Sequence, residues 1–161
     1  VFKQTFTRAL KVLPSPMNNN GVDIPNPASK LIESIISGTD GSYIYDPSVN
    51  FIELGVKEGD IVYYPFTSEI QCDKIQSVFA DEIILVNGGV PSVDSVYSIY
   101  SSNYDNKGCY IFSQKGGNLH VKTLGGDDII INATSGSILP IQIVQLYQDD
   151  TDNPFSNIAL W

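Results

Sequence analysis

Short runs of alternating apolar and polar residues dominate this chain, and they constrain its fold more than any other feature. Ten such runs, rich in β-branched and aromatic residues, occur at 41–46, 60–66, 72–80, 82–86, 95–101, 109–114, 118–124, 128–133, 138–148 and 157–161. The segments between them include "NGG", "KGG", "GGDD" and "SGS", whose residues tolerate the positive φ angles of tight turns. Closely spaced period-two strands with such turns are typical of an all-β protein. The pattern predicts an antiparallel β-sandwich or barrel.

The first 37 residues of the chain depart from this pattern. Four prolines and three successive asparagines lie in "LPSPMNNNGVDIPNP", a composition that favours an extended segment over a packed element. We therefore expect residues 1–27 to run over a surface, of this chain or of a neighbour. The next stretch, 28–37, fits a short helix by its apolar spacing and equally fits a strand by its alternation, so both readings stay open.

These features divide the chain into three parts. Residues 1–37 are expected to form an extended N-terminal arm and connector, and 38–100 to form a β lobe. The polar stretch "SSNYDNKG" at 101–108 marks a boundary before a C-terminal β module at 108–161. Two small lobes within one β-rich chain are therefore an alternative to a single sandwich.

Composition excludes several classes of function. Charged residues make up 17% of the 161 residues, and 18 acids against 9 bases give a net charge of −9. Such a chain repels a nucleic-acid backbone, so we expect no nucleic-acid partner. No apolar run is long enough to span a membrane, and the first residues lack the pattern of a signal peptide. We expect a protein made in the cytoplasm, without a membrane partner.

Residues that carry catalysis or bind metals are sparse. His120 is the single histidine, the nucleophile motif G-x-S-x-G is absent, and we interpret His120 as a surface or interface residue. Cys72 and Cys109 are far apart in the sequence and are expected to act as small hydrophobic residues. The acidic turn "QDDTDNPF" at 148–155 lacks the glycine and glutamate of a calcium loop. The sequence therefore predicts no enzyme, no cofactor and no metal.

Aromatic residues point instead to contact surfaces. The chain has nine tyrosines and seven phenylalanines, which on a sheet can serve protein contacts or stack against sugars. Its last residues, "PFSNIALW", include the single tryptophan, and exposed apolar groups of this size need a docking site in their own fold or on a partner. The interface candidates are Phe2, Phe6, Leu10, Leu160 and Trp161.

The stretch 109–161 resembles the C-terminal module of tailed-phage virion proteins related to the spike base protein of gene transfer agents. The resemblance rests on a strand, Gly-Gly, an alternating strand, Gly-Gly-Asp, a further strand, a small turn, a Leu-Pro strand and a terminal "I-x-ALW". The matching positions are Tyr110, Gly116, Gly117, Gly125, Gly126, Asp127, Gly136, Leu139, Pro140, Ile158, Ala159, Leu160 and Trp161. A second, upstream stretch at 54–86 is similar to a module common in phage structural proteins.

This resemblance implies a component of the virion. The first expectation is a capsid decoration or spike-base subunit that binds the major capsid protein or other virion proteins and forms a homo-oligomer, where repetition adds avidity. A tail, neck or baseplate component is the close alternative. A carbohydrate-binding module for host attachment is the alternative from a different class.

Overall fold

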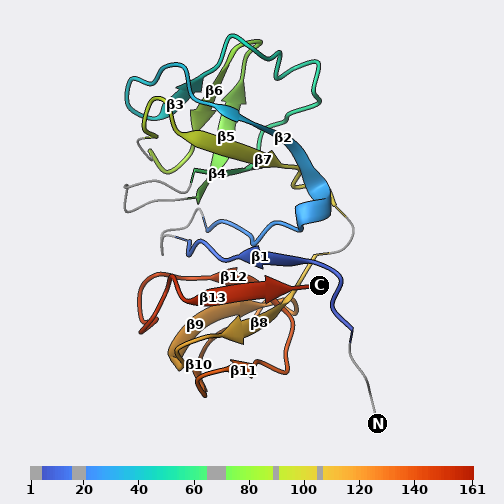
Figure 1. Cartoon of the computed structure of the whole chain (residues 1–161), viewed down its shortest axis with the longest axis vertical. Helices are drawn as coiled ribbons and strands as arrows, with labels where there is room; N and C mark the ends of the chain where they lie inside the picture. Colours follow the sequence, from blue (N-terminus) through green and yellow to red (C-terminus); the bar gives the residue numbers. More distant parts are fainter. Residues whose placement is uncertain (1–4, 16–20, 65–71, 89–90, 105–106) are drawn as a thin grey trace.

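The computed structural model describes residues 5–15, 21–64, 72–88, 91–104 and 107–161, and they form an all-β protein (Figure 1). Three antiparallel sheets are present and none closes into a barrel, which confirms the predicted fold class and favours the sandwich over the barrel. The elements are β1 (Ala9–Lys11), the 3-10 helix η1 (Pro27–Ser29), β2 (Lys30–Ile35), β3 (Tyr43–Tyr45), β4 (Ile61–Tyr63), β5 (Cys72–Val78), β6 (Glu82–Leu85), β7 (Val96–Tyr100), β8 (Tyr110–Ser113), β9 (Gly117–Thr123), β10 (Asp128–Ala133), β11 (Ser137–Ile138), β12 (Ile143–Leu146) and β13 (Asn157–Leu160).

The first lobe comprises the described residues of 27–102 and forms the upper half of Figure 1. Its six strands lie in the order β2-β7-β4-β5-β6-β3. The alternation in the sequence is visible in the burial pattern, since Ile83 and Leu85 of β6 are buried while Glu82 and Ile84 are partly exposed. The fully enclosed side chains of this core are Ile36, Ile44, Phe51, Val62, Ile83, Tyr97 and Ile99.

The second lobe comprises the described residues of 5–26 and 107–161. It packs a four-stranded sheet, in the order β1-β13-β8-β11, against a three-stranded sheet, in the order β10-β9-β12. The core between these sheets contains Val12, Ile24, Cys109, Ile111, Leu119, Val121, Ile143, Leu146 and Ala159. This arrangement of two sheets around one apolar core is a β-sandwich.

The N-terminal residues take part in this sandwich, which differs from the expected surface arm. Strand β1 pairs with β13, and residues 12–15 are buried. The N–H of Ser15 donates to the Leu146 carbonyl at 2.7 Å, and the N–H of Ile24 donates to the Val144 carbonyl at 2.7 Å. Both bonds go to backbone carbonyls on the edge of β12 that does not pair with β9. The segment is thereby held against the sandwich, and its residues Val12 and Ile24 belong to the core of the second lobe.

The stretch 28–37, for which the sequence left helix and strand open, is the strand β2 preceded by one 3-10 turn. Asn26 begins that turn, because its side-chain oxygen accepts from the N–H of Ala28 at 2.9 Å. Strand β2 then pairs with β7 in the first lobe. The segment 1–37 is thus divided, with β1 in the second lobe and β2 in the first.

A third apolar cluster joins the two lobes, and we call it the lobe junction. It consists of Leu13, Val22, Ile61, Tyr63, Cys72 and Tyr100, with Leu10 packed against it. Leu13 lies at its centre, where its N–H donates to the Tyr63 hydroxyl at 3.4 Å and its carbonyl accepts from the Cys72 thiol at 3.5 Å. The N-terminal segment therefore lies between the lobes and covers the outer face of β4 and β7.

The last strand, β13, docks within its own fold. It lies between β1 and β8, with Leu160 opposite both Ala9 and Tyr110. The carbonyl of Trp161 accepts from the N–H of Thr7 at 2.7 Å, and its N–H donates to the Arg8 carbonyl at 3.0 Å. Of the two docking sites that the sequence left open for this tail, the structure has the one in its own sheet.

Candidate functional site

Three of the predicted interface residues meet at one surface cleft of the second lobe, here called the aromatic cleft. It is lined by Thr5, Phe6, Gly108, Tyr110, Gln142, Leu160 and Trp161. The strand register explains the convergence, because Leu160 lies opposite Tyr110 across β13 and β8. The Phe6 ring lies 5.8 Å from the Tyr110 ring, centroid to centroid, at an angle of 59°. Such a tilted pair is favourable for aromatic rings.

The aromatic and leucine side chains of the aromatic cleft, Phe6, Tyr110, Leu160 and Trp161, are half-buried. Trp161 packs on the core of the second lobe through its apolar surface. Its indole Nε1 is enclosed and has no hydrogen-bond partner among the described residues. A buried donor without an acceptor costs free energy, which offsets part of the stabilisation gained by packing the indole.

The other two interface candidates do not join this cleft. Leu10 lies on the opposite side of β1 from the aromatic cleft's lining and packs against the lobe junction, so it serves the contact between the lobes. Phe2 lies outside the described residues. Tyr110 is the aromatic residue of the cleft that the sequence did not single out as an interface candidate. Tyr110 joins the cleft because β8 pairs with β13 in a register that places it opposite Leu160, and a local sequence pattern does not reveal that register.

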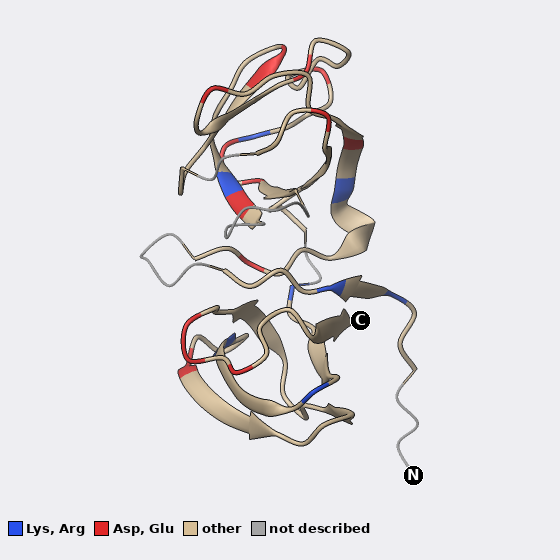
Figure 2. Cartoon of the chain, turned by 60° about the vertical axis from the view of Figure 1, so that its left-hand side comes forward, with Lys and Arg blue, Asp and Glu red and all other residues tan. Residues whose placement is uncertain are grey.

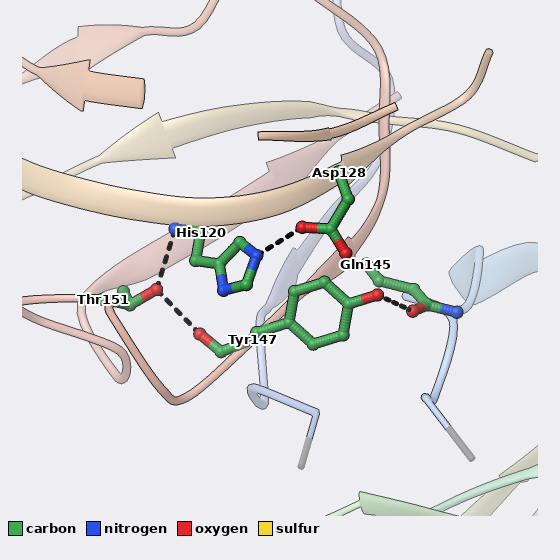
Figure 3. Close-up of polar contacts among 5 residues, drawn as sticks. All are labelled: His120, Asp128, Gln145, Tyr147 and Thr151. Atoms are coloured by element: carbon green, nitrogen blue, oxygen red, sulfur yellow. Dashed lines mark hydrogen bonds and ion pairs between the residues drawn. The ribbon is translucent and has the colours of Figure 1, made fainter. Parts of the chain in front are cut away.

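A second cluster of polar side chains surrounds His120 on the outer face of β9, β10 and β12 (Figure 3). The His120 Nε2 contacts the Asp128 Oδ1, and the His120 ring lies 4.7 Å from the ring of Tyr147. The Tyr147 hydroxyl donates to the Gln145 Oε1 at 2.9 Å. Below the ring, the Thr151 hydroxyl donates to the Tyr147 carbonyl at 2.7 Å and accepts from the His120 N–H at 3.0 Å.

The geometry of this cluster holds the imidazole in place. One ring nitrogen of His120 is occupied by Asp128, and the other, Nδ1, is enclosed without a hydrogen-bond partner in the described part of the chain. Burial raises the pKa of Tyr147, and the negative charges of Asp128 and Asp23 raise it further, so this phenol stays neutral at physiological pH. The cluster fixes the position of β12 against β9 and presents no free imidazole nitrogen.

The tyrosines do not gather on one surface. Tyr63, Tyr64, Tyr97 and Tyr100 are buried, and the Tyr97 hydroxyl donates to the buried Asp46 carboxylate at 2.7 Å. Burial raises the pKa of Tyr97, and the neighbouring carboxylate of Asp46 adds to the shift. Four of the residues that suggested an aromatic surface are therefore parts of the core and the lobe junction.

Both cysteines are free and buried thiols. Burial raises the pKa of Cys109 to about 12 and raises that of Cys72 as well, with the Asp73 charge as a second cause at Cys72. Neither thiol is therefore ionised at neutral pH, and both act as small apolar residues.

Basic residues show no clustering in the regions that the structure describes. Lys and Arg are spread singly over both lobes there (Figure 2). Across the same regions, no three His, Cys, Asp or Glu side chains are placed to hold a metal ion. No helix in the described ranges is long and apolar enough to cross a membrane.

Comparison of the chain with models of known protein families, with curated proteins and with solved structures found no match.

Proposed function

We propose that this chain is a non-enzymatic structural protein of a tailed-phage virion, a capsid decoration or spike-base subunit that binds the assembled shell. The proposal rests on the sequence resemblance over 109–161 and on the aromatic cleft. Its partners are the major capsid protein or other virion proteins, and its location is the virion.

The aromatic cleft is the observation that carries the proposal. Phe6, Tyr110 and Trp161 place three aromatic side chains, all partly exposed, around one depression. The cores of protein interfaces are enriched in aromatic residues, whereas charged side chains are depleted there. Among the described residues, no charged side chain lines this cleft. Its composition therefore favours contact with another protein.

The glycines of the resemblance have structural reasons in this fold. Gly116 has a φ of 71°, and a Cβ atom there would lie 2.6 Å from the Ser135 nitrogen. Gly117 has a φ of 94°, and its Cβ would lie 2.7 Å from Asp152 Oδ2. Any larger residue would distort the turn between β8 and β9. The Gly-Gly element of the resemblance is thus required by the turn between β8 and β9 in the second lobe.

A structural role also fits the His120 cluster. Acid–base catalysis requires a ring nitrogen within hydrogen-bond reach of a substrate. Here one nitrogen is bound to Asp128 and the other is enclosed. The carbohydrate-binding alternative requires tyrosines on the surface. Tyr63, Tyr64, Tyr97 and Tyr100 are buried and cannot stack against a sugar. Protein contact is therefore the function that this geometry favours.

The proposal is tested on particles from the source of the chain. Immunogold labelling with an antibody against the chain is expected to mark purified virions at the capsid surface. A label confined to the tail, neck or baseplate would support the alternative location, and unlabelled particles would contradict a virion role. A glycan array tests the carbohydrate alternative, and specific binding there would favour it.

The cleft is tested by co-sedimentation of purified chain with particles stripped of it. Phe6→Ser should weaken binding by about 30-fold, because an aromatic hot spot contributes about 2 kcal/mol or more. Phe79→Ser is the matched control, since Phe79 is 50% exposed on the first lobe and lies outside the cleft. Equal binding of both variants would exclude the cleft as the contact surface.

A further inference from the structure

Strand β10 forms an open edge of the three-stranded sheet. It pairs with β9 over its whole length, from Asp128 opposite Lys122 to Ala133 opposite Gly117, and with no other strand in the described residues. Two of its apolar side chains are exposed, Ile130 at 54% and Ile129 at 38%. An exposed apolar edge strand can pair with another chain.

The hydrogen bonds of β9 identify which backbone groups of β10 are free. The N–H of Thr123 donates to the Asp127 carbonyl at 2.8 Å, and in an antiparallel ladder every second pair exchanges such bonds. On β9, the carbonyl of His120 instead accepts from Tyr147, on the opposite side. The N–H and C=O groups of Asp128, Ile130 and Asn132 therefore point away from β9 toward the open edge.

The other six-residue edge strand, β2, is protected against such pairing. It contains the exposed ion pair of Lys30 and Glu33, with 2.9 Å between Nζ and Oε2, and its register against β7 shifts between Lys30 and Ile32. Charges and bulges on an edge prevent further strands from adding. Strand β10 has a continuous register and no Lys or Arg.

We propose that a second copy of this chain pairs with β10 in antiparallel orientation, about a two-fold axis at Ile130. In this register Ile130 lies opposite the partner's Ile130, and Asp128 lies opposite the partner's Asn132. All three outward-facing residues of each copy then take part, which gives about six backbone hydrogen bonds because each bonded pair exchanges two. The two three-stranded sheets become one sheet that runs through both copies.

The side chains of β10 are complementary in this register. The Asn132 amide uses one N–H for the Asn118 Oδ1 at 3.1 Å, and its second N–H is available for a carboxylate of the partner. The two Asp128 carboxylates are four residues apart along the strands, about 13 Å, which exceeds the screening length of about 8 Å at physiological salt. Ile129 is covered by the partner's Ile131. No like charges face each other.

The position of β10 leaves room for a second copy. In the three-stranded sheet β12 lies beside the first lobe, and β10 lies on the far side (Figure 1). A two-fold axis at β10 therefore directs the first lobes of the two copies away from each other. This inference rests on strand geometry and does not depend on the virion proposal.

A disulfide tests the register. In a bonded antiparallel pair the Cα atoms lie about 5.5 Å apart, within the range of about 4.4 to 6.8 Å that a disulfide spans. Under mild oxidation Ile130→Cys should form a covalent dimer on a non-reducing gel. Asn132→Cys is the control, because its copy lies about 13 Å away along the strands. Cys72 and Cys109 are buried and add no background.

A charge substitution tests the association itself. Sedimentation velocity of the unmodified chain over a concentration series should show a monomer–dimer equilibrium. Ile130→Lys places two positive charges at the axis and should raise the dimer Kd by at least about 30-fold. Ile35→Lys, at a residue 55% exposed on β2, should leave it unchanged. A monomeric unmodified chain, equal effects of both lysines, or equal cross-linking of both cysteine variants would overturn the proposal.

Discussion

The two lobes differ in how the chain builds them. The first lobe is formed by consecutive residues, and neighbours such as β4, β5 and β6 pair in sequence order. The second lobe brings together the two ends of the sequence, because β1 pairs with β13 across about 150 residues. Its sandwich is complete only when both of these strands are in place. The stability of the second lobe should therefore depend on residues that the first lobe does not need.

The lobe junction connects the first lobe to the second. Its residues from the N-terminal segment, Leu13 and Val22, cover Ile61, Tyr63 and Tyr100 of the first lobe. One short segment thus completes a sheet of the second lobe and covers a face of the first. Changes in this segment should affect both lobes, whereas changes in β13 should affect mainly the second.

Deletion of residues 157–161 is expected to have the largest effect. It removes β13 from between β1 and β8, together with the packing of Ala159 and Trp161. Loss of a packed tryptophan alone costs about 3 to 5 kcal/mol, against a total stability of about 5 to 15 kcal/mol. The second lobe should unfold, and circular dichroism melting should show a reduced folded signal.

Hydrogen exchange of the same truncated chain separates the lobes. Backbone amides of β4, β5 and β7 should retain protection, because the core of the first lobe contains no residue of β13. Uniform loss of protection in both lobes would show that the first lobe does not fold without the second. Unchanged protection throughout would show that β13 contributes little to the sandwich.

Substitution of Leu13 tests the link between the lobes. Leu13→Ala leaves a cavity in the lobe junction and should lower the free energy of unfolding by about 2 to 5 kcal/mol, measured by urea denaturation. Ile35→Ala is the control, since its exposed side chain should change stability by no more than about 0.5 kcal/mol. A cost at Leu13 as small as that of the control would mean that the lobes contact each other only loosely.

A buried polar pair in the first lobe predicts a pH dependence. Burial alone would raise the pKa of Asp46, but hydrogen bonds from Ser34, Ser48 and Tyr97 lower it overall. Because the folded pKa lies below the unfolded value of about 3.9, the stabilisation is complete above that value and is lost as the pH falls through the folded pKa. Tyr97→Phe removes one of these bonds and should cost about 1.5 to 3 kcal/mol at neutral pH.

The measurement is urea denaturation of the unmodified chain and of Tyr97→Phe between neutral and strongly acidic pH. The difference between the two should shrink as Asp46 becomes protonated, because a neutral carboxyl accepts the bond more weakly. A difference that stays constant over this range would mean that the cost comes from packing and not from the charge of Asp46.

Local patterns predicted most strands of this fold and could not predict the pairing of its ends. The run at 128–133 is β10, and that at 118–124 corresponds to β9 within one residue. The run at 138–148 is divided between β11 and β12, with Pro140, which lacks a backbone N–H, in the break. Strand β1 was missed because three residues carry little alternation, and its partner lies at the other end of the chain.

The candidate site was predictable only in part, for the same reason. Phe6, Leu160 and Trp161 were predicted as interface residues because they are large apolar groups near the two ends of the chain. The three residues meet in the aromatic cleft. Tyr110 joins them through the register of β8, and Leu10 leaves them because it packs on the first lobe. Both outcomes depend on tertiary contacts that a single sequence does not encode locally.

The smallest effect is expected at His120, whose contact with Asp128 is more exposed than the buried pair of Tyr97 and Asp46. His120→Phe keeps a ring against Tyr147 and removes only the contact with Asp128, whose side chain is 57% exposed. Water and salt screen such a pair, so its loss should cost no more than about 1 kcal/mol in urea denaturation at neutral pH. Asp128→Asn provides the second side of a double-mutant cycle, which isolates the pair from the packing of the ring. If the coupling energy in this cycle exceeded the cost of Tyr97→Phe, polar contacts on the surface of the second lobe would stabilise the protein more than those buried in the first, and the comparison of the two lobes would be reversed.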